Sequence, residues 1–169
     1  RQLISKIDKN FLIDFMKALQ EKSIIKYYNI PQQEALGFYS SIIDLFTKPL
    51  FVKALKKQMK SKRHLHGLSK GIIKHLWCVS LFSYIDSKKE NVCLARAGML
   101  HDLTLEHNNY VADSTHQKSA AQLARKIGEP LEEIKAIEDH LFFDIVRLRR
   151  VPQTRLARKL LLYDALIST

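Results

Sequence analysis

Apolar residues recur every three or four positions along most of this chain, with polar residues between them. This spacing predicts amphipathic helices, each with one buried face. Alternation with a period of two never extends beyond a few positions, so we expect an all-α protein. The predicted helices cover about residues 4–28 (one or two helices), 32–46, 50–59, 69–86, 92–103, 115–127, 130–140, and from 152 onward.

Particular residues indicate where several helices begin or end. Pro49, Pro130 and Pro152 suit the first turn of a helix, where a backbone N–H has no partner to lose. Ser69 is a suitable N-cap, and Gly128 a suitable C-terminal stop. These signals divide the periodic stretches into separate helices.

The length of 169 residues suits one globular domain with a sizeable core. We expect residues 1–63 to form an N-terminal helical extension that packs on a core formed by residues 64–169. Basic residues gather between 53 and 63, a pattern typical of a solvated helix face. The sequence has no internal repeat and no glycine-rich phosphate loop, so P-loop and dinucleotide-binding folds are unsupported.

The formal net charge of +11 favours anionic partners such as nucleotides, phosphorylated metabolites, nucleic acid or a membrane surface. Cys78 and Cys93 form no CxxC motif, which favours a reducing environment. There is no run of about 18 apolar residues, and the first residues lack the order of a signal peptide. We therefore expect a cytoplasmic protein that does not enter a membrane.

The apolar stretch 92–103 ends in two adjacent side chains that can bind metal, His101 and Asp102. A buried carboxylate costs several kcal/mol unless it is paired or coordinates a cation. His75 and Asp164 also fall on the apolar faces of their predicted helices, as does His116, and His140 lies at a helix end. Taken singly, each of these residues has an ordinary structural interpretation; Asp164, for example, would suit a buried Arg96 or Arg158.

Together, six such residues predict a metal site. Imidazole and carboxylate ligands without thiolates suit Fe, Mn, Co, Ni, Zn or Mg, and six ligands suffice for two ions bridged by one carboxylate. Two ions would acidify a bridging water to a hydroxide nucleophile and neutralise charge on a phosphoryl oxygen. This chemistry indicates phosphoester hydrolysis.

The ordered set of motifs resembles the HD-domain metal-dependent phosphohydrolases. The likeness covers about residues 65–169. The motifs that carry it are Lys74-His75-Leu76-Trp77-Cys78-Val79-Ser80, Ala97-Gly98-Met99-Leu100-His101-Asp102, Thr115-His116-Gln117-Lys118-Ser119-Ala120, Glu138-Asp139-His140 and Tyr163-Asp164-Ala165.

The resemblance implies an HD-like helical bundle and a role for each ligand. His75, His101, Asp102 and Asp164 would hold the first metal, and Asp102, His116 and His140 the second, with Asp102 as the bridge. His101 and Asp102 would be the catalytic pair. Thr104 and Leu105 stand where many members have Gly and Lys, so a lysine beside the pair is missing.

Basic residues elsewhere are candidates for binding a substrate phosphate. Arg155 and Arg158 follow Pro152 on the predicted last helix, Lys118 follows His116, and His66 precedes the helix of His75. Plain surface basicity is the competing interpretation for all four.

We therefore predict a hydrolase that cleaves a small phosphorylated metabolite, with a nucleotide as the favoured substrate. One alternative is an HD-type di-iron oxygenase, since a minority of HD-like proteins use the same six ligands with O₂. Another is a basic helical module that binds nucleic acid through residues 53–63 and 147–158 and keeps a vestigial metal site. Few aromatic residues interleave with those stretches, which disfavours single-strand binding. The sequence is also compatible with a homodimer.

Overall fold

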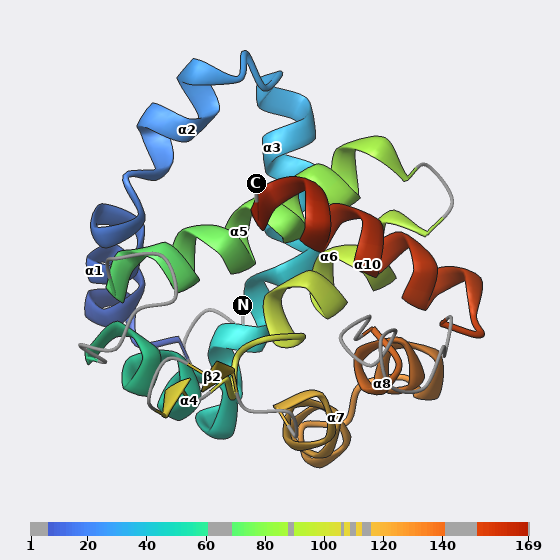
Figure 1. The fold of residues 1–169 in the computed structure, drawn as a ribbon. Helices are drawn as coiled ribbons and strands as arrows, with labels where there is room; N and C mark the ends of the chain where they lie inside the picture. Colours follow the sequence, from blue (N-terminus) through green and yellow to red (C-terminus); the bar gives the residue numbers. More distant parts are fainter. Residues whose placement is uncertain are drawn as a thin grey trace.

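The computed structural model describes residues 7–60, 69–87, 90–105, 107–108, 111–112, 116–140 and 152–168. It is built almost entirely from helices, so the all-α prediction is confirmed (Figure 1). Within the described residues, the strands are limited to β1 (His107–Asn108) and β2 (Val111–Ala112), which pair antiparallel.

The helices follow the predicted ranges, except that the helix expected to reach residue 103 ends at Leu100, so His101 and Asp102 lie in the turn after it. The helices are α1 (Lys9–Leu19), α2 (Glu21–Tyr27), α3 (Gln32–Ile42), the 3₁₀ helix η2 (Ile43–Thr47), α4 (Pro49–Lys60), α5 (Ser69–Asp86), α6 (Asn91–Leu100), α7 (His116–Lys126), α8 (Leu131–Glu138) and α10 (Arg155–Ser168).

Local chemistry explains most of these boundaries. α4 begins at Pro49 and α5 at Ser69, as predicted, and Gly128 beyond the end of α7 has a φ of 85°, which glycine adopts without strain. The last helix begins at Arg155 and not at Pro152, because the hydroxyl of Thr154 accepts a hydrogen bond from the backbone N–H of Ala157 at 3.1 Å. The threonine cap, and not the proline, sets this boundary.

The core surrounds α5 and α6, with α1 and α2 on one side and α7 and α8 on the other (Figure 1). Trp77 of α5 is 1% exposed, and its ring centroid lies 5.9 Å from that of Phe15 and 5.0 Å from that of Phe38. The N-terminal helices therefore share one hydrophobic core with α5 and α6. The division at residue 63 falls in 61–68, outside the described residues, and stays a prediction.

Helices α5 and α6 approach each other closely at Gly98. A Cβ atom at this position would lie 2.8 Å from the backbone N and Cα of Ser80. The Ser80 hydroxyl also donates a hydrogen bond to the carbonyl of Ala95. Glycine thus allows the helix that carries His75 to lie directly against the helix that ends at His101.

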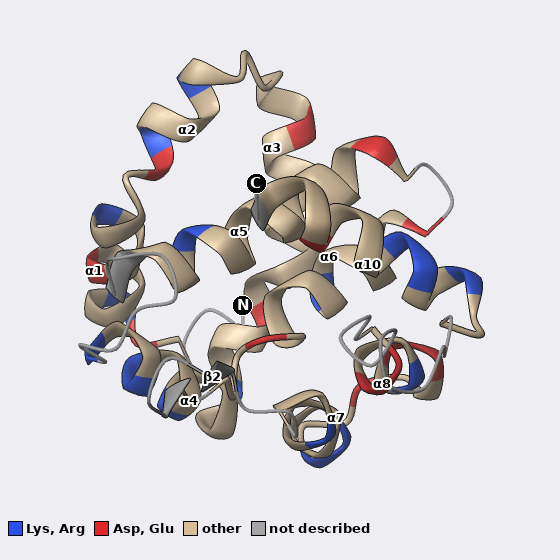
Figure 2. Ribbon diagram, viewed as in Figure 1, with Lys and Arg blue, Asp and Glu red and all other residues tan. Residues whose placement is uncertain are grey.

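Basic residues are spread over α1, α4, α7 and the start of α10 (Figure 2). On α4 the four lysines are exposed, which agrees with a solvated helix face; they are Lys53, Lys56, Lys57 and Lys60. Lys62 and Arg63 of the predicted patch lie outside the described residues. None of the described helices is by itself long and apolar enough to cross a membrane; residues 32–47 and 49–60 meet that test only jointly, across a 99° bend.

Candidate metal centre

Six side chains predicted from the sequence to bind metal converge at one place in the fold. They come from α5, the turn after α6, the start of α7, the end of α8 and α10. They form two groups that share Asp102. Within each group, the candidate ligand atoms all lie within 4.8 Å of one another. One group is His75, His101, Asp102 and Asp164, and the other is Asp102, His116 and His140.

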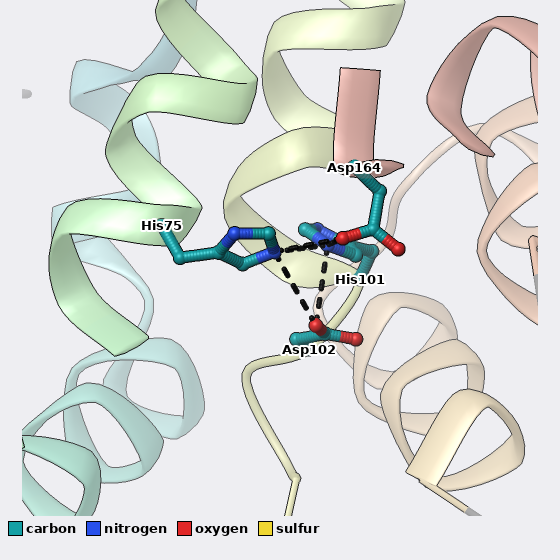
Figure 3. A group of neighbouring side chains, drawn as sticks. All are labelled: His75, His101, Asp102 and Asp164. Atoms are coloured by element: carbon teal, nitrogen blue, oxygen red, sulfur yellow. Dashed lines mark hydrogen bonds and ion pairs between the residues drawn. The ribbon is translucent and has the colours of Figure 1, made fainter. Parts of the chain in front are cut away.

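In the first group, His75 and Asp164 reach the His101–Asp102 pair from different helices (Figure 3). His75 Nε2 lies 2.9 Å from Asp164 Oδ1, 3.3 Å from His101 Nε2 and 3.5 Å from Asp102 Oδ2. His101 Nε2 lies 3.4 Å from Asp102 Oδ2 and 3.6 Å from Asp164 Oδ1. Four candidate ligand atoms therefore surround one point.

In the second group, two histidines face the other oxygen of Asp102. His116 Nε2 lies 3.1 Å from Asp102 Oδ1, and His140 Nε2 lies 3.3 Å from the same atom. The two oxygens of one carboxylate are thus directed at separate sets of imidazoles, the arrangement of a bridging ligand.

Two of the histidines are oriented by the ends of their own helices. The last carbonyls of an α-helix have no intrahelical donor. His101 Nδ1 donates to the carbonyl of Gly98 at 2.8 Å, and His140 Nδ1 donates to the carbonyl of Ile137. Each bond leaves Nε2 as the nitrogen that faces the cluster, with its lone pair available to a cation.

The spacing and chemistry of the first group fit a metal ion. Ligand atoms about 2.1 Å from an ion lie roughly 3.0–3.5 Å from each other in octahedral or tetrahedral geometry. The observed separations of 2.9–3.6 Å span that interval. The nitrogen lone pairs and carboxylate oxygens would repel one another without a proton or a cation between them. Imidazoles and carboxylates suit divalent Fe, Mn, Co, Ni or Zn.

A proton on His75 offsets part of the negative charge of the two carboxylates in the cluster. Burial alone would lower the pKa of His75, but its bonds to Asp102 and Asp164 outweigh this effect and raise its pKa to about 9. Burial would raise the pKa of Asp102, yet His101 and the histidines bonded to its carboxylate hold that pKa well below its usual range. The pKa of Asp164 is lowered likewise, against its burial, by His101 and His75. A cation that binds here must displace the His75 proton.

The side chains of the cluster differ in their exposure to solvent. The side chains of His101 and His140 are 0% exposed, whereas that of Asp102 is 12% exposed and that of Asp164 is 20% exposed. The two carboxylates are therefore more accessible to solvent than His101 and His140.

Comparisons of the chain with family models, curated proteins and solved structures found no match. The case for a metal centre therefore depends on the geometry of the six residues.

The described contacts of Arg155 and Arg158, two of the predicted phosphate-binding residues, are with groups outside the cluster. Arg155 is largely exposed and lies 3.6 Å from Glu90, and Arg158 donates to the backbone carbonyls of Pro152 and Gln153 at 2.9 and 3.3 Å. Arg155 thus contacts the residue before α6, and Arg158 contacts the segment before α10. Lys118 is exposed on α7. His66 lies outside the described residues, and the roles of all four stay predictions.

Neither Arg96 nor Arg158, the two arginines suggested as partners of Asp164, has its described contacts with that carboxylate. Asp164 pairs with His75, whereas Arg96 is bonded to Glu129 and Asp44 on the other side of α6. Helical periodicity placed Asp164 on a buried face correctly, but it does not specify which helix packs against that face.

Two residues that support the cluster were missed in the sequence. Gln58 Nε2 donates to the carbonyls of Leu103 and Leu105 at 2.8 and 2.9 Å, which fixes the chain directly after Asp102. The Thr104 hydroxyl donates to the carbonyl of His116 at 3.1 Å. A signal for Gln58 existed, because this polar residue lies on the buried stripe of α4 at helical spacing from buried apolar residues.

Proposed function

We propose that this chain is an HD-type metal-dependent phosphohydrolase that cleaves a phosphoester of a small phosphorylated metabolite, with a nucleotide as the favoured substrate. The observation that carries the proposal is the position of Asp102, whose Oδ2 faces His75 and His101 while Oδ1 faces His116 and His140. A bridging carboxylate suits two ions about 3.5–4 Å apart, the spacing used in two-metal hydrolysis.

The first group would hold one ion and the second group the other, with Asp102 common to both. Ions bound there would supply a water of lowered pKa and positive charge opposite a phosphoryl oxygen.

Charge balance supports an anionic substrate. Four histidines must be neutral to coordinate, and two carboxylates carry two negative charges, so two divalent ions would leave a net charge of about +2. Because the surroundings are buried, this charge is poorly screened and attracts an anion strongly. The net charge of +11 of the whole chain acts in the same direction at longer range.

The protein's own residues would fix geometry and exclude water. His101 and Asp102 are adjacent in the chain, and the Gly98 carbonyl orients the His101 ring. The buried sides of His101 and His140 keep solvent away from the back of the cluster. Asp164 is the most exposed of the six side chains, so we place the entry of the substrate on its side of the ions.

The test combines metal analysis with an activity screen. Purified protein should contain up to two divalent ions per chain and should hydrolyse nucleotides or p-nitrophenyl phosphate with Mn²⁺, Co²⁺, Ni²⁺ or Mg²⁺. His101→Ala and Asp102→Ala should abolish hydrolysis and retain a helical circular dichroism spectrum. Asp14→Asn, a change at an exposed carboxylate on α1, is the control and should keep full activity. Full activity in Asp102→Ala would refute the proposal.

Metal analysis, the activity screen and a gel-shift assay separate the alternatives. Two irons per chain with oxygen-dependent turnover would favour the di-iron oxygenase. A salt-dependent gel shift at physiological ionic strength without hydrolysis would favour the nucleic-acid-binding module. A cytoplasmic location, supported by the free cysteines Cys78 and Cys93, and a homodimer remain predictions.

A further inference from the structure

Helices α7 and α8 form a hairpin that supplies both histidines of the second group. His116 is the first residue of α7, and His140 follows shortly after the end of α8, so both lie at the open end of the hairpin. The turn between the helices contains Gly128 and Glu129, and the Glu129 N–H donates to the carbonyl of Ala124 at 3.0 Å. The turn lies at the opposite end from the histidines, about 12 Å away along the eight residues of α8.

At the turn, a buried ion pair fastens the hairpin to α6. Arg96 Nε lies 3.1 and 3.0 Å from the two carboxylate oxygens of Glu129, and Arg96 Nη2 lies 2.6 Å from Oε1. The side chains are only 13% and 3% exposed. Arg96 Nη1 also donates to the carbonyl of Ser41 at 3.0 Å and to Asp44, so the same guanidinium reaches α3 and η2. A bidentate ion pair of this kind fixes the orientation of the two side chains as well as the distance between them.

Helices α6 and α8 run side by side toward the cluster. Near their starts, Cys93 Sγ lies 3.4 Å from Glu132 Oε1, and at their ends His140 Nε2 lies 3.3 Å from Asp102 Oδ1. The Arg96–Glu129 pair is thus an attachment between α6 and the hairpin that is separate from the cluster.

The first group does not use this hairpin. His75 is on α5, His101 and Asp102 follow α6, and Asp164 is on α10. The start of α10 is held by a different ion pair, in which Lys159 Nζ lies 2.9 Å from Glu90 Oε2. Loosening the hairpin therefore acts directly on two of the three ligands of the second group, and the first group has no ligand on the hairpin.

We infer that Arg96 and Glu129 are positioning residues for the second ion: their buried pair sets how the α7–α8 hairpin lies on α6, and hence how His116 and His140 face Asp102. The inference rests on the proposed two-ion function. The pair touches neither the ions nor the substrate, so it acts only through the two histidines.

The experiment measures binding of Mn²⁺ to the full chain by isothermal titration calorimetry, with the number of bound ions checked by elemental analysis. Glu129→Gln keeps the size of the side chain and removes its charge. In this variant the second ion should bind at least about tenfold more weakly, which is the smaller end of the effect seen when residues that orient metal ligands are changed. The first ion should bind within about twofold of wild type. Because the histidines are intact, excess Mn²⁺ should restore the second ion, whereas His116→Ala should not be restored.

Glu90→Gln is the matched control, because it breaks an ion pair on the α10 side and should leave the affinity for the second ion unchanged. Arg96→Lys replaces Glu129→Gln if the latter does not fold; if neither folds, the pair is a folding requirement and the inference fails. It also fails if wild type and Glu129→Gln bind both ions equally, or if Glu90→Gln weakens the second ion as much. If the wild-type protein binds no second ion, both this inference and the proposed two-ion function fail.

Discussion

Gly98→Ala should disturb the first group of ligands by separating α5 from α6. The added Cβ would lie 2.8 Å from the backbone of Ser80, and ordinary contact begins at 3.4 Å, so the helices must move apart by about 0.6 Å. Backbone atoms cannot rotate away, unlike the end of a side chain. Overpacking of this kind costs about 1–3 kcal/mol of unfolding free energy.

The same displacement matters for metal binding. Ligand distances at metal sites hold to within about 0.2 Å, and a shift of about 0.6 Å exceeds that tolerance. His75 is carried by α5 and His101 by the end of α6, so the separation of their Nε2 atoms, now 3.3 Å, should change. We expect Mn²⁺ to bind the first group about tenfold more weakly, as measured by calorimetry together with urea unfolding.

Gly37→Ala provides the matched control. Its Cβ would meet the hydroxyl of Tyr84, the far end of a side chain that can rotate, and alanine is favoured over glycine within a helix by up to about 1 kcal/mol. This variant should keep both stability and Mn²⁺ affinity. If Gly98→Ala behaves like Gly37→Ala in both measurements, the close helix contact does not position His75, and the reasoning is refuted.

Three further predictions concern protons, a buried amide and metal removal. Glu133 is 1% exposed, and its burial together with its bond to Glu129 raises its pKa from 4.5 to about 9. Its contribution to the free energy of unfolding is therefore complete below pH 4.5 and declines toward pH 9 by up to about 1.4 kcal/mol per pH unit. Glu133→Gln should lose this slope in urea melts at pH 6 and 8; an unchanged slope would contradict the assignment. Gln58→Met leaves two carbonyls without their donor and should cost about 1–3 kcal/mol in the same assay, whereas no loss would show that the bonds are dispensable. Mn²⁺ affinity should rise up to tenfold per pH unit from pH 7 to 9, because the His75 proton, with a pKa of about 9, is lost over this range; pH-independent binding would argue against His75 as a ligand. Bound Mn²⁺ should also raise Tm, and a chelator should reverse that gain.

The sequence was sufficient to predict the helices and the inward direction of the candidate ligands. His75 and Asp164 were identified because helical spacing puts a residue on a definite face, and the structure shows both faces buried against each other. Helix ends were predicted where a residue has a conformational reason to begin or end a helix, as at Ser69 and Gly128.

The partners of charged side chains could not be predicted in this way. Arg155 was predicted as a phosphate-binding residue from its spacing alone, and its contact with Glu90 depends on how α10 packs beside the start of α6. Arg96 was associated with Asp164, although three segments distant in sequence direct other groups toward it. Which neighbour a long charged side chain contacts depends on the tertiary arrangement, which helical spacing does not specify.

The pairing of His75 with Asp164 closes a loop of almost ninety residues. An ion held between them would act as a removable crosslink, since it would restrict the unfolded chain far more than a tie between near neighbours. The order in which the polypeptide acquires its metal would then follow the order in which it folds, because the complete set of ligands exists only after the last helix has docked.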